Sequence, residues 1–297
     1  MKRFLLRLGV FAFLVAFGYV AALVVIVFLN RRALPNCRLE KPTDSVIIGD
    51  SHPMWAIDDT DIAGLRNIAL NAEGYKYSYQ KLKHLLATEK GIKKIYIGYS
   101  HHNLAGYYDE YISGPTFANF IERYLAILDP GDYVELAAKN PSSVLDFTQR
   151  ILQRGWRPAL NRRCQIYGSF PGQPMTAKFN LASMEKRIRE QYYLNGDVAP
   201  PSAANIEYLR KLVELSRQHG LEIVMLKTPQ HKTYEARIPE AYHRRYASFL
   251  QENGLKAYGF EDLEVTDAEV LPDGDHLNLE GALATTRRFK QYHESAK

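Results

Sequence analysis

The chain has 297 residues, of which 46% are hydrophobic and 24% are charged, a balance that excludes an intrinsically disordered protein. This length can bury a sizeable core in one large domain or in two small ones. The formal net charge is +5, and acidic and basic residues are mixed along the chain apart from a basic N-terminus. A nucleic-acid partner is therefore not expected, and a membrane surface or an acidic polymer explains the charge equally well.

The first 32 residues differ from the rest of the chain. No charged residue occurs from Leu8 to Leu29, and basic residues flank this apolar run on both sides. A helix of about 20 apolar residues can cross a bilayer, whereas a cleaved signal peptide has an apolar core of about 7–15 residues and a small-residue cleavage site. Residues 1–32 are therefore predicted to be an uncleaved transmembrane signal anchor.

The flanking charges slightly favour a cytoplasmic N-terminus. This predicts a single-pass protein of the inner (cytoplasmic) membrane, with the remainder of the chain periplasmic or extracellular. Residues 33–44 are polar, contain two prolines and predict a short juxtamembrane linker. The two cysteines, Cys37 and Cys164, have no metal-type spacing. They could pair on the outer side of the membrane or remain free, and the sequence leaves both possibilities open.

Short apolar runs alternate with helical patterns in residues 45–297. The runs are typical of buried parallel strands and cover residues 45–50, 66–70, 93–100, 221–228 and 255–260. The helical patterns cover residues 77–91, 202–220, 239–252 and 279–294. Such alternation indicates βαβ units. It predicts one three-layer α/β domain, with a flavodoxin-like parallel sheet of about five strands between two layers of helices.

Residues from about 105 to 200 interrupt this alternation. Three helix-like segments, at residues 115–129, 132–140 and 143–156, precede a stretch that is rich in Gly and Pro, "YGSFPGQPM". We interpret the region as a helical insertion with irregular loops at the edge or over the mouth of the sheet. Insertions at such positions often shape a substrate site.

Two distant motifs supply the residues of a nucleophilic site. "VIIGDSH" places Ser51 at the carboxyl end of the first predicted strand, where open α/β sheets bind ligands. A serine hydroxyl needs a histidine to take its proton and an acid to orient that histidine. In "LPDGDHLNLEGA", Asp273 can reach Nδ1–H of His276 across a turn that Gly274 permits. Asp275 is expected to be a solvated turn residue, with replacement of Asp273 as its alternative role.

These motifs carry a family resemblance. "GDSH" after the first strand, with "DGDH" before the last helix, resembles the SGNH (GDSL-like) hydrolase superfamily. More narrowly, the chain is similar to membrane-anchored members that modify cell-surface polymers, including the proteins of alginate O-acetylation and teichoic-acid D-alanylation. The resemblance covers both ends of residues 42–297 but not the insertion. It implies that Ser51 is the nucleophile and that His276 and Asp273 complete the triad.

The resemblance also implies an oxyanion hole. The N–H groups of Ser51 and Gly74 match two of the family's donors. The family's third donor is the Asn of G-x-N-D, but here the third strand ends in "IGYSHHN", so Ser100 and His101 stand where Asn and Asp are expected. Asn103 could supply the amide two or three residues late. Loss of one donor costs about 10²–10³ in rate, so this departure concerns rate rather than reaction type.

Further polar residues follow the strand ends. His52, His101 and His102 form a cluster without the carboxylate spacing of a metal site, so no metal is expected. Instead, His101 and His102 are candidates for substrate hydrogen bonds. Thr228 and His231 follow the fourth strand and are either substrate contacts or members of a surface loop.

The expected function is that of a membrane-anchored serine esterase or O-acyltransferase, which transfers an acyl group (acetyl is the first candidate) without a cofactor. Its substrate would be a carbohydrate polymer or glycolipid outside the cytoplasm, and family analogy adds a multi-span acyltransferase as a partner. The alternative is a catalytically inactive SGNH-like module for polysaccharide binding or assembly, which the altered third motif favours. The sequence does not identify the polymer, the acyl group or the direction of transfer.

Overall fold

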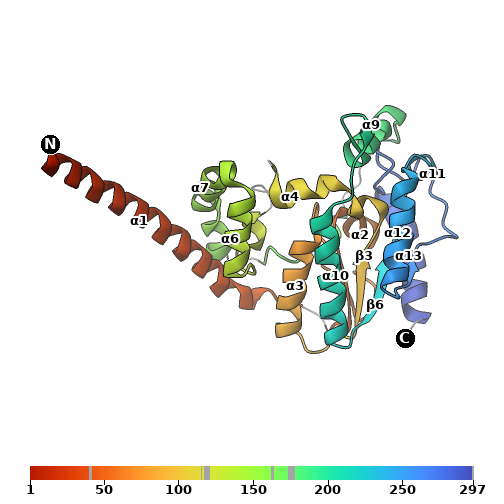
Figure 1. The fold of residues 1–297 in the computed structure, drawn as a ribbon. Helices are drawn as coiled ribbons and strands as arrows, with labels where there is room; N and C mark the ends of the chain where they lie inside the picture. The colour runs from red at the N-terminus through yellow and green to blue at the C-terminus, as the bar shows by residue number, and fades with distance from the viewer. Residues whose placement is uncertain (40–41, 115, 117–120, 162–163, 173–177, 296–297) are drawn as a thin grey trace. The chain divides into compact units, whose positions relative to one another are not determined.

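The computed structural model describes the chain except for residues 40–41, 115, 117–120, 162–163, 173–177 and 296–297 (Figure 1). Two compact units are distinguished by their internal contacts. Unit 1 comprises Met1–Cys37 and Ser113–Gln165, and unit 2 comprises Arg38–Ile112 and Ile166–Lys297. About half of the region from 105 to 200 thus groups with the N-terminal helix, and the remainder of it with the α/β sheet.

Unit 2 contains the predicted parallel sheet. Its strand order is β2-β1-β3-β6-β7, with every neighbouring pair parallel. This order is flavodoxin-like, so the predicted fold class is confirmed. The strands are shorter than the apolar runs that predict them: β1 Ser45–Ile48, β2 Leu65–Asn67, β3 Lys94–Gly98, β6 Glu222–Leu226 and β7 Ala257–Tyr258.

Helices cover both faces of the sheet because the central strands are apolar on both sides. Ile48 of β1 and Ile97 of β3 belong to one core cluster, whereas Ile47 and Tyr96 belong to the cluster on the opposite face. The first layer contains α3 Tyr75–Thr88, α10 Ala203–Gln218 and α12 Glu240–Glu252 (Figure 1). The second layer contains α2 Ser51–Ala56 and α13 Leu279–Ser295.

Local signals set the helix ends. Ser202 is the N-cap of α10, and its hydroxyl accepts a hydrogen bond from the Asn205 N–H at 2.9 Å. Gly220 follows the helix at φ +68°, a left-handed conformation that glycine adopts readily. The helices predicted over residues 202–220, 239–252 and 279–294 are present with bounds shifted by one or two residues.

Shorter elements surround the carboxyl edge of the sheet. They are the 3₁₀ turns η2 His101–Leu104 and η3 Gly106–Asp109, helices α4 Glu110–Ser113, α9 Leu181–Tyr192 and α11 Lys232–Glu235, and the antiparallel hairpin β4 Tyr193–Leu194 with β5 Asp197–Val198. The Gly/Pro-rich stretch predicted as irregular lies partly outside the described residues.

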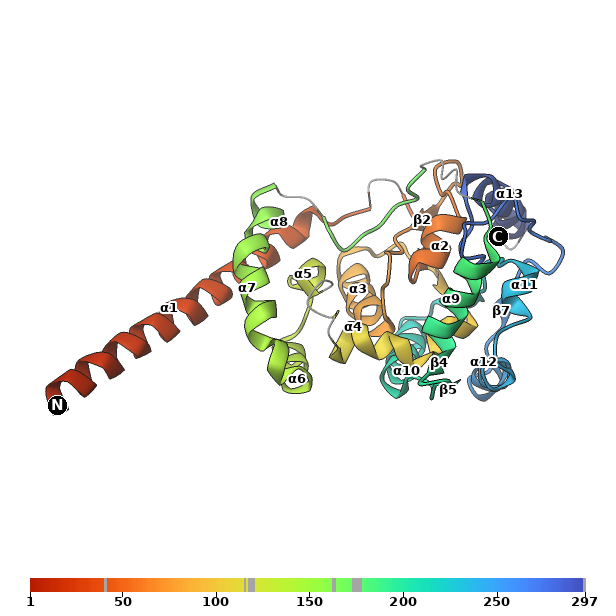
Figure 2. The same cartoon turned by 90° about the horizontal axis from the view of Figure 1, so that it is seen from above.

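Unit 1 is built on one long helix, α1 Lys2–Ala33, which is long and apolar enough to cross a membrane. Its second half packs against shorter helices, and Figure 2 shows α7 and α8 beside it. Asn30 Nδ2 donates to the Gly155 carbonyl, and Tyr19 Oη bonds Thr148 Oγ1 at 2.6 Å. The other elements are η1 Leu34–Asn36, α5 Ile121–Tyr124, α6 Pro130–Lys139, η5 Pro141–Ser143, α7 Val144–Arg154 and α8 Trp156–Asn161.

A disulfide closes unit 1. Cys37 and Cys164 are bonded, with their Cα atoms 4.8 Å apart, and they are 127 residues apart in the sequence. The bond joins the end of η1 to the segment that follows α8. The two cysteines are therefore paired rather than free, a choice that the sequence leaves open.

Candidate active site

Ser51 lies directly after the sharp turn that joins β1 to α2. Gly49 has φ +141°, and a Cβ on Gly49 would lie 3.1 Å from the Gly98 Cα and from Pro53 Cγ. A Cβ on Gly98 would lie 2.8 Å from Pro53 Cγ. The two glycines therefore let the ends of β1 and β3 and the first turn of α2 approach closely. Asp50 caps α2, and Ser51 is its first residue.

The structure brings the three predicted triad residues together. Ser51 Oγ lies 2.8 Å from His276 Nε2, and His276 Nδ1 lies 2.9 Å from Asp273 Oδ2. An ionised carboxylate only accepts hydrogen bonds, so the imidazole proton belongs on Nδ1 and leaves Nε2 to accept the Ser51 hydroxyl proton. The His276 and Asp273 side chains are 13% and 26% exposed, so the site is reachable from solvent.

The turn that carries His276 is fixed by its own backbone. Gly274 adopts φ +66°, as the turn requires, and its N–H donates to the Leu271 carbonyl. Asp273 Oδ1 accepts the N–H groups of Asp275 and His276 at 3.1 and 3.2 Å. Burial raises the pKa of Asp273, but the hydrogen bond and the charge of His276 outweigh burial and hold the pKa below its ordinary value.

Asp275 is buried, so the prediction of a solvated turn residue is wrong. Its Oδ2 accepts from Arg187 Nε and Gln191 Nε2, both at 2.9 Å, and its Oδ1 accepts from Gln230 Nε2 at 2.7 Å. Oδ1 also lies 3.1 Å from His52 Nε2. Burial raises the pKa of Asp275, but His52 and Arg187 together hold it well below its ordinary value. Asp275 is therefore a buried anion, and it does not replace Asp273.

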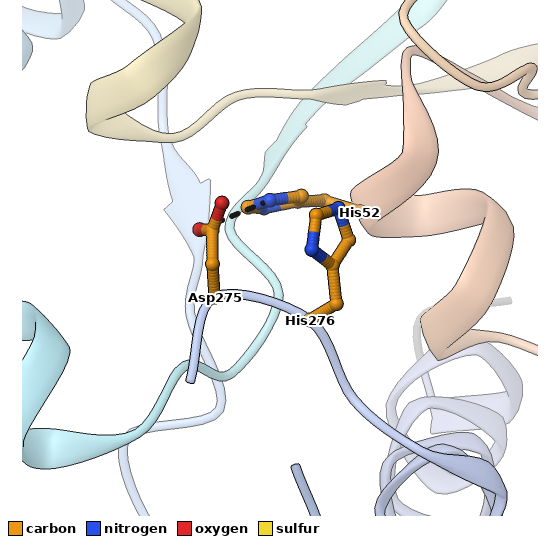
Figure 3. Close-up of side chains that lie close together, drawn as sticks. All are labelled: His52, Asp275 and His276. Carbon is orange, nitrogen blue, oxygen red and sulfur yellow. Dashed lines mark ion pairs between the residues drawn. The ribbon is translucent and has the colours of Figure 1, made fainter. Parts of the chain in front are cut away.

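His52, Asp275 and His276 form a compact group (Figure 3). Their nearest N and O atoms lie within 4.8 Å of one another, a spacing that a metal ion could use. However, the Asp275 carboxylate already binds the Arg187 guanidinium, which would repel a cation, and His276 Nε2 already faces Ser51. We therefore assign the group to the surroundings of the triad. The His52 ring lies edge-on to the His276 ring, with centroids 4.7 Å apart.

A second buried carboxylate lies directly before Ser51 in the sequence. Asp50 Oδ2 accepts from His102 Nε2 at 2.7 Å, from Asn103 Nδ2 at 2.8 Å and from the Tyr108 hydroxyl. Asp50 Oδ1 accepts the His52 N–H at 3.0 Å. Burial raises the pKa of Asp50, but His102 and the other donors hold it well below its ordinary value. Asp50 is therefore part of a charged hydrogen-bond network rather than a simple turn residue.

Asn103 lies further along the chain than the expected asparagine, and the structure shows how its amide still approaches β1. Residues 101–104 form the 3₁₀ turn η2, and Asn103 Oδ1 accepts the Ser100 N–H at 2.7 Å in a capping box. This turn carries the amide back toward β1, where Nδ2 donates to Asp50 and to the Tyr108 hydroxyl at 3.2 Å. Both interactions draw the Asn103 amide toward Asp50. Its proposed role in an oxyanion hole therefore has less support than that of the backbone N–H groups.

Gly74 is the N-cap of α3. A Cβ at this position would lie 3.3 Å from Asn205 Oδ1, which accepts the Tyr75 N–H at 2.7 Å. The helix start is thus packed closely against α10, and a glycine suits the close approach.

The four predicted substrate contacts lie inside the protein. His101, His102, Thr228 and His231 are all at most 4% exposed. His102 binds Asp50, and His231 Nε2 lies 2.9 Å from Asp267 Oδ1. These side chains expose too little surface to hold a polymer directly, so we do not carry them into the proposed substrate site.

His101 predicts a pH dependence of stability. Burial, together with Lys227 and two nearby histidines, lowers the pKa of His101 to about 2. The folded protein keeps the ring neutral, whereas the unfolded chain takes up a proton below about pH 6.5. His101 therefore destabilises the fold as pH falls from 6.5, by up to about 1.4 kcal/mol per pH unit. We expect His101→Phe to flatten the decline of the full chain's thermal midpoint between pH 7 and 5.

The matched control is His219→Gln, because His219 is exposed at the end of α10. This variant is expected to retain the wild-type dependence on pH. A His101→Phe variant whose midpoint declines as steeply as that of wild type would contradict the prediction.

Comparisons with known proteins add little to this geometry. No protein-family model matches the chain, and no curated protein matches it significantly. A solved structure from Streptococcus pneumonia, provisionally described as a platelet activating factor, is similar over 96% of this chain and 98% of that one. The identity is 13% and the TM-score 0.41. We draw no conclusion about function from a similarity of this extent.

Proposed function

We propose that the chain is a membrane-anchored serine esterase or O-acyltransferase of the SGNH type. The observation that carries this proposal is the hydrogen-bonded chain from Ser51 through His276 to Asp273. Its members come from opposite ends of the sequence and meet at the carboxyl end of the sheet, where α/β folds bind ligands. Enzymes that transfer acyl groups hold a nucleophile, a base and an orienting acid in this order.

The reaction would proceed through an acyl-enzyme. Ser51 Oγ attacks the ester carbonyl while His276 Nε2 takes the hydroxyl proton, and Asp273 holds the resulting imidazolium. The N–H groups of Ser51 and Gly74 are the proposed donors to the oxyanion, with Asn103 as a third candidate. The tetrahedral intermediate collapses, and His276 returns the proton to the departing alkoxide. Water or a sugar hydroxyl then attacks the acyl carbonyl while His276 takes its proton, and His276 returns this proton to Ser51 Oγ as the acyl–Ser51 bond breaks, which gives hydrolysis or transfer.

The proposed substrate is a carbohydrate polymer or glycolipid outside the cytoplasm. Two features support this location. α1 is long and apolar enough to span a membrane, and the Cys37–Cys164 disulfide is typical of oxidising compartments. The family resemblance adds acetyl as the acyl group and a multi-span acyltransferase as the donor partner.

A catalytically inactive binding or assembly module is the second candidate. The hydrogen bond from Asn103 to Asp50 favours it, because this bond draws the amide away from the family's role as an oxyanion donor. Such a module would keep the fold and a substrate groove without acyl transfer.

A serine-directed fluorophosphonate probe separates the two candidates. We expect the full chain in detergent to be labelled, and Ser51→Ala to lose the label entirely. Ser183→Ala is the matched control, because Ser183 is an exposed serine on α9, and it should retain full labelling. Labelling that persists in Ser51→Ala would exclude Ser51 as the nucleophile, and an unlabelled wild type would favour the inactive module. Turnover of p-nitrophenyl acetate with and without oligosaccharides then distinguishes transfer from hydrolysis.

A further inference from the structure

Unit 1 contains an apolar groove of about 450 Å³ between α1, α6 and α7. Its walls include Val27 of α1, Val134 of α6, and Phe147 and Ile151 of α7. Among the lining residues that the structure describes, only Arg31 is charged. The volume is in the range of small-molecule sites, which are about 300–1,000 Å³.

The groove lies at a defined depth along α1. The uncharged run from Leu8 to Leu29 is about 33 Å long as a helix, slightly more than the ~30 Å hydrocarbon core of a bilayer. The groove is lined by Thr148, which bonds Tyr19 near the middle of this run, and by four α1 residues, Leu23, Val24, Val27 and Arg31. Arg31 and Arg32 follow the run after Asn30 and are suited to the headgroup level. In a bilayer that this run spans, the groove therefore extends from the hydrocarbon core to the headgroups.

The helices beside α1 expose large apolar side chains, as helices at a membrane surface do. Val134, Leu145 and Leu160 are 70%, 77% and 67% exposed, although each is a large apolar side chain. Trp156 is 42% exposed, and tryptophan prefers the membrane–water interface. A bilayer surface would cover these side chains, which water solvates poorly.

We propose that this groove binds a hydrocarbon chain of an anionic membrane lipid, whose headgroup pairs with Arg31. The Arg31 guanidinium uses one N–H group on the Leu128 carbonyl, at 2.8 Å, and a guanidinium has five N–H donors in all. The size of the groove favours a lipid chain over a partner's helix. A helix about 10 Å wide occupies roughly 420 Å³ per turn, so the groove would hold only one turn. This inference does not depend on the proposed acyl transfer.

Photocrosslinking of the full chain in nanodiscs of phosphatidylcholine and phosphatidylglycerol tests the proposal. A benzophenone amino acid replaces Val134, which lines the groove and is exposed enough to be changed without disturbing the core. The same residue at Val15, which is exposed in the middle of the apolar run and distant from its basic ends, reports contact with bulk lipid. Mass spectrometry of the intact protein identifies the adducts. Val144, which also lines the groove, is a second position if the Val134 variant is not produced.

We expect lipid adducts at both positions, with the ratio of phosphatidylglycerol to phosphatidylcholine about fivefold higher at Val134 than at Val15. Arg31→Gln should reduce the ratio at Val134 to that at Val15. Equal ratios in the wild-type background would overturn the anionic-lipid assignment. Adducts to a second copy of the chain or to another protein, or no adduct at either groove position, would overturn the lipid proposal itself.

Discussion

Replacing Asp273 with Asn is expected to lower kcat for p-nitrophenyl acetate by about 10³–10⁴ at pH 7. The Asn amide would donate to His276 Nδ1 instead of accepting from it, so the imidazole proton would move to Nε2. That nitrogen lies 2.8 Å from Ser51 Oγ and could no longer take the hydroxyl proton. The loss would come from the wrong tautomer rather than from a change of shape, because Asn and Asp have the same size.

The matched control for this prediction is Asp197→Asn. Asp197 is an exposed acid on β5, so the same chemical change should leave kcat within about twofold of wild type. Steady-state kinetics of the full chain in detergent supply both values. If Asp273→Asn retained more than a tenth of the wild-type kcat, Asp273 would not be the orienting acid.

The sheet could be predicted from local patterns, and the approach of Ser51 to His276 and Asp273 from two short motifs. β1 and β3 are apolar on both faces, and helical repeats of ordinary length separate the strands. Such patterns determine a parallel sheet and therefore the edge at which Ser51 emerges. His276 and Asp273 lie three residues apart on one turn, so their relative position follows from the local sequence.

The environment of the triad could not be predicted because its contacts are distant in the sequence. Asp275 follows Gly274 in a polar turn, which normally indicates solvent. Its partners Arg187 and Gln191 come from α9, 88 and 84 residues away, and no pattern in α9 indicates a buried acid. The contact of Asn103 with Asp50 likewise depends on the 3₁₀ turn η2. This turn brings the Asn103 side chain back toward the end of β1.

The packing of unit 1 could not be predicted from the sequence either. The sequence predicts helices over much of residues 113–165, but an amphipathic helix does not reveal what its apolar face covers. In the structure, α7 and α8 pack on α1. The disulfide between Cys37 and Cys164 joins two segments of this unit that no spacing rule connects.

Two buried carboxylates, Asp50 and Asp275, lie on either side of His52, the residue that follows Ser51. The His52 N–H donates to Asp50, and His52 Nε2 lies 3.1 Å from Asp275. The pKa of each acid is held well below its ordinary value against the opposing effect of burial. Both therefore remain ionised at neutral pH, and their donors fix the loops that carry Ser51 and His276.

Removing one of these acids should be more damaging than removing it together with its cation. Asp275→Leu leaves the Arg187 guanidinium, whose side chain is 25% exposed, without its carboxylate. Breaking a buried ion pair from one side typically costs about 3–5 kcal/mol, whereas apolar replacement of both partners is often close to neutral. We therefore expect Asp275→Leu to be strongly destabilised and to exchange amide hydrogens rapidly in residues 271–278. The double variant Asp275→Leu/Arg187→Met should recover the part of both losses that comes from the unpaired guanidinium, but not the part that comes from the buried donors of Gln191 and Gln230.

Hydrogen exchange and the thermal midpoint of the full chain measure the two effects. Glu264→Gln is the control, because the Glu264–Lys232 pair is exposed and its loss should leave both measurements close to those of wild type. A depressed pKa in the folded state means that the stabilisation by Asp275 is complete above about pH 4 and is lost as pH falls through the folded value. The difference between wild type and Asp275→Leu should therefore be full at pH 7 and shrink in strong acid. Equal losses in the single and double variants would show that the unpaired Arg187 guanidinium does not cause the destabilisation of Asp275→Leu.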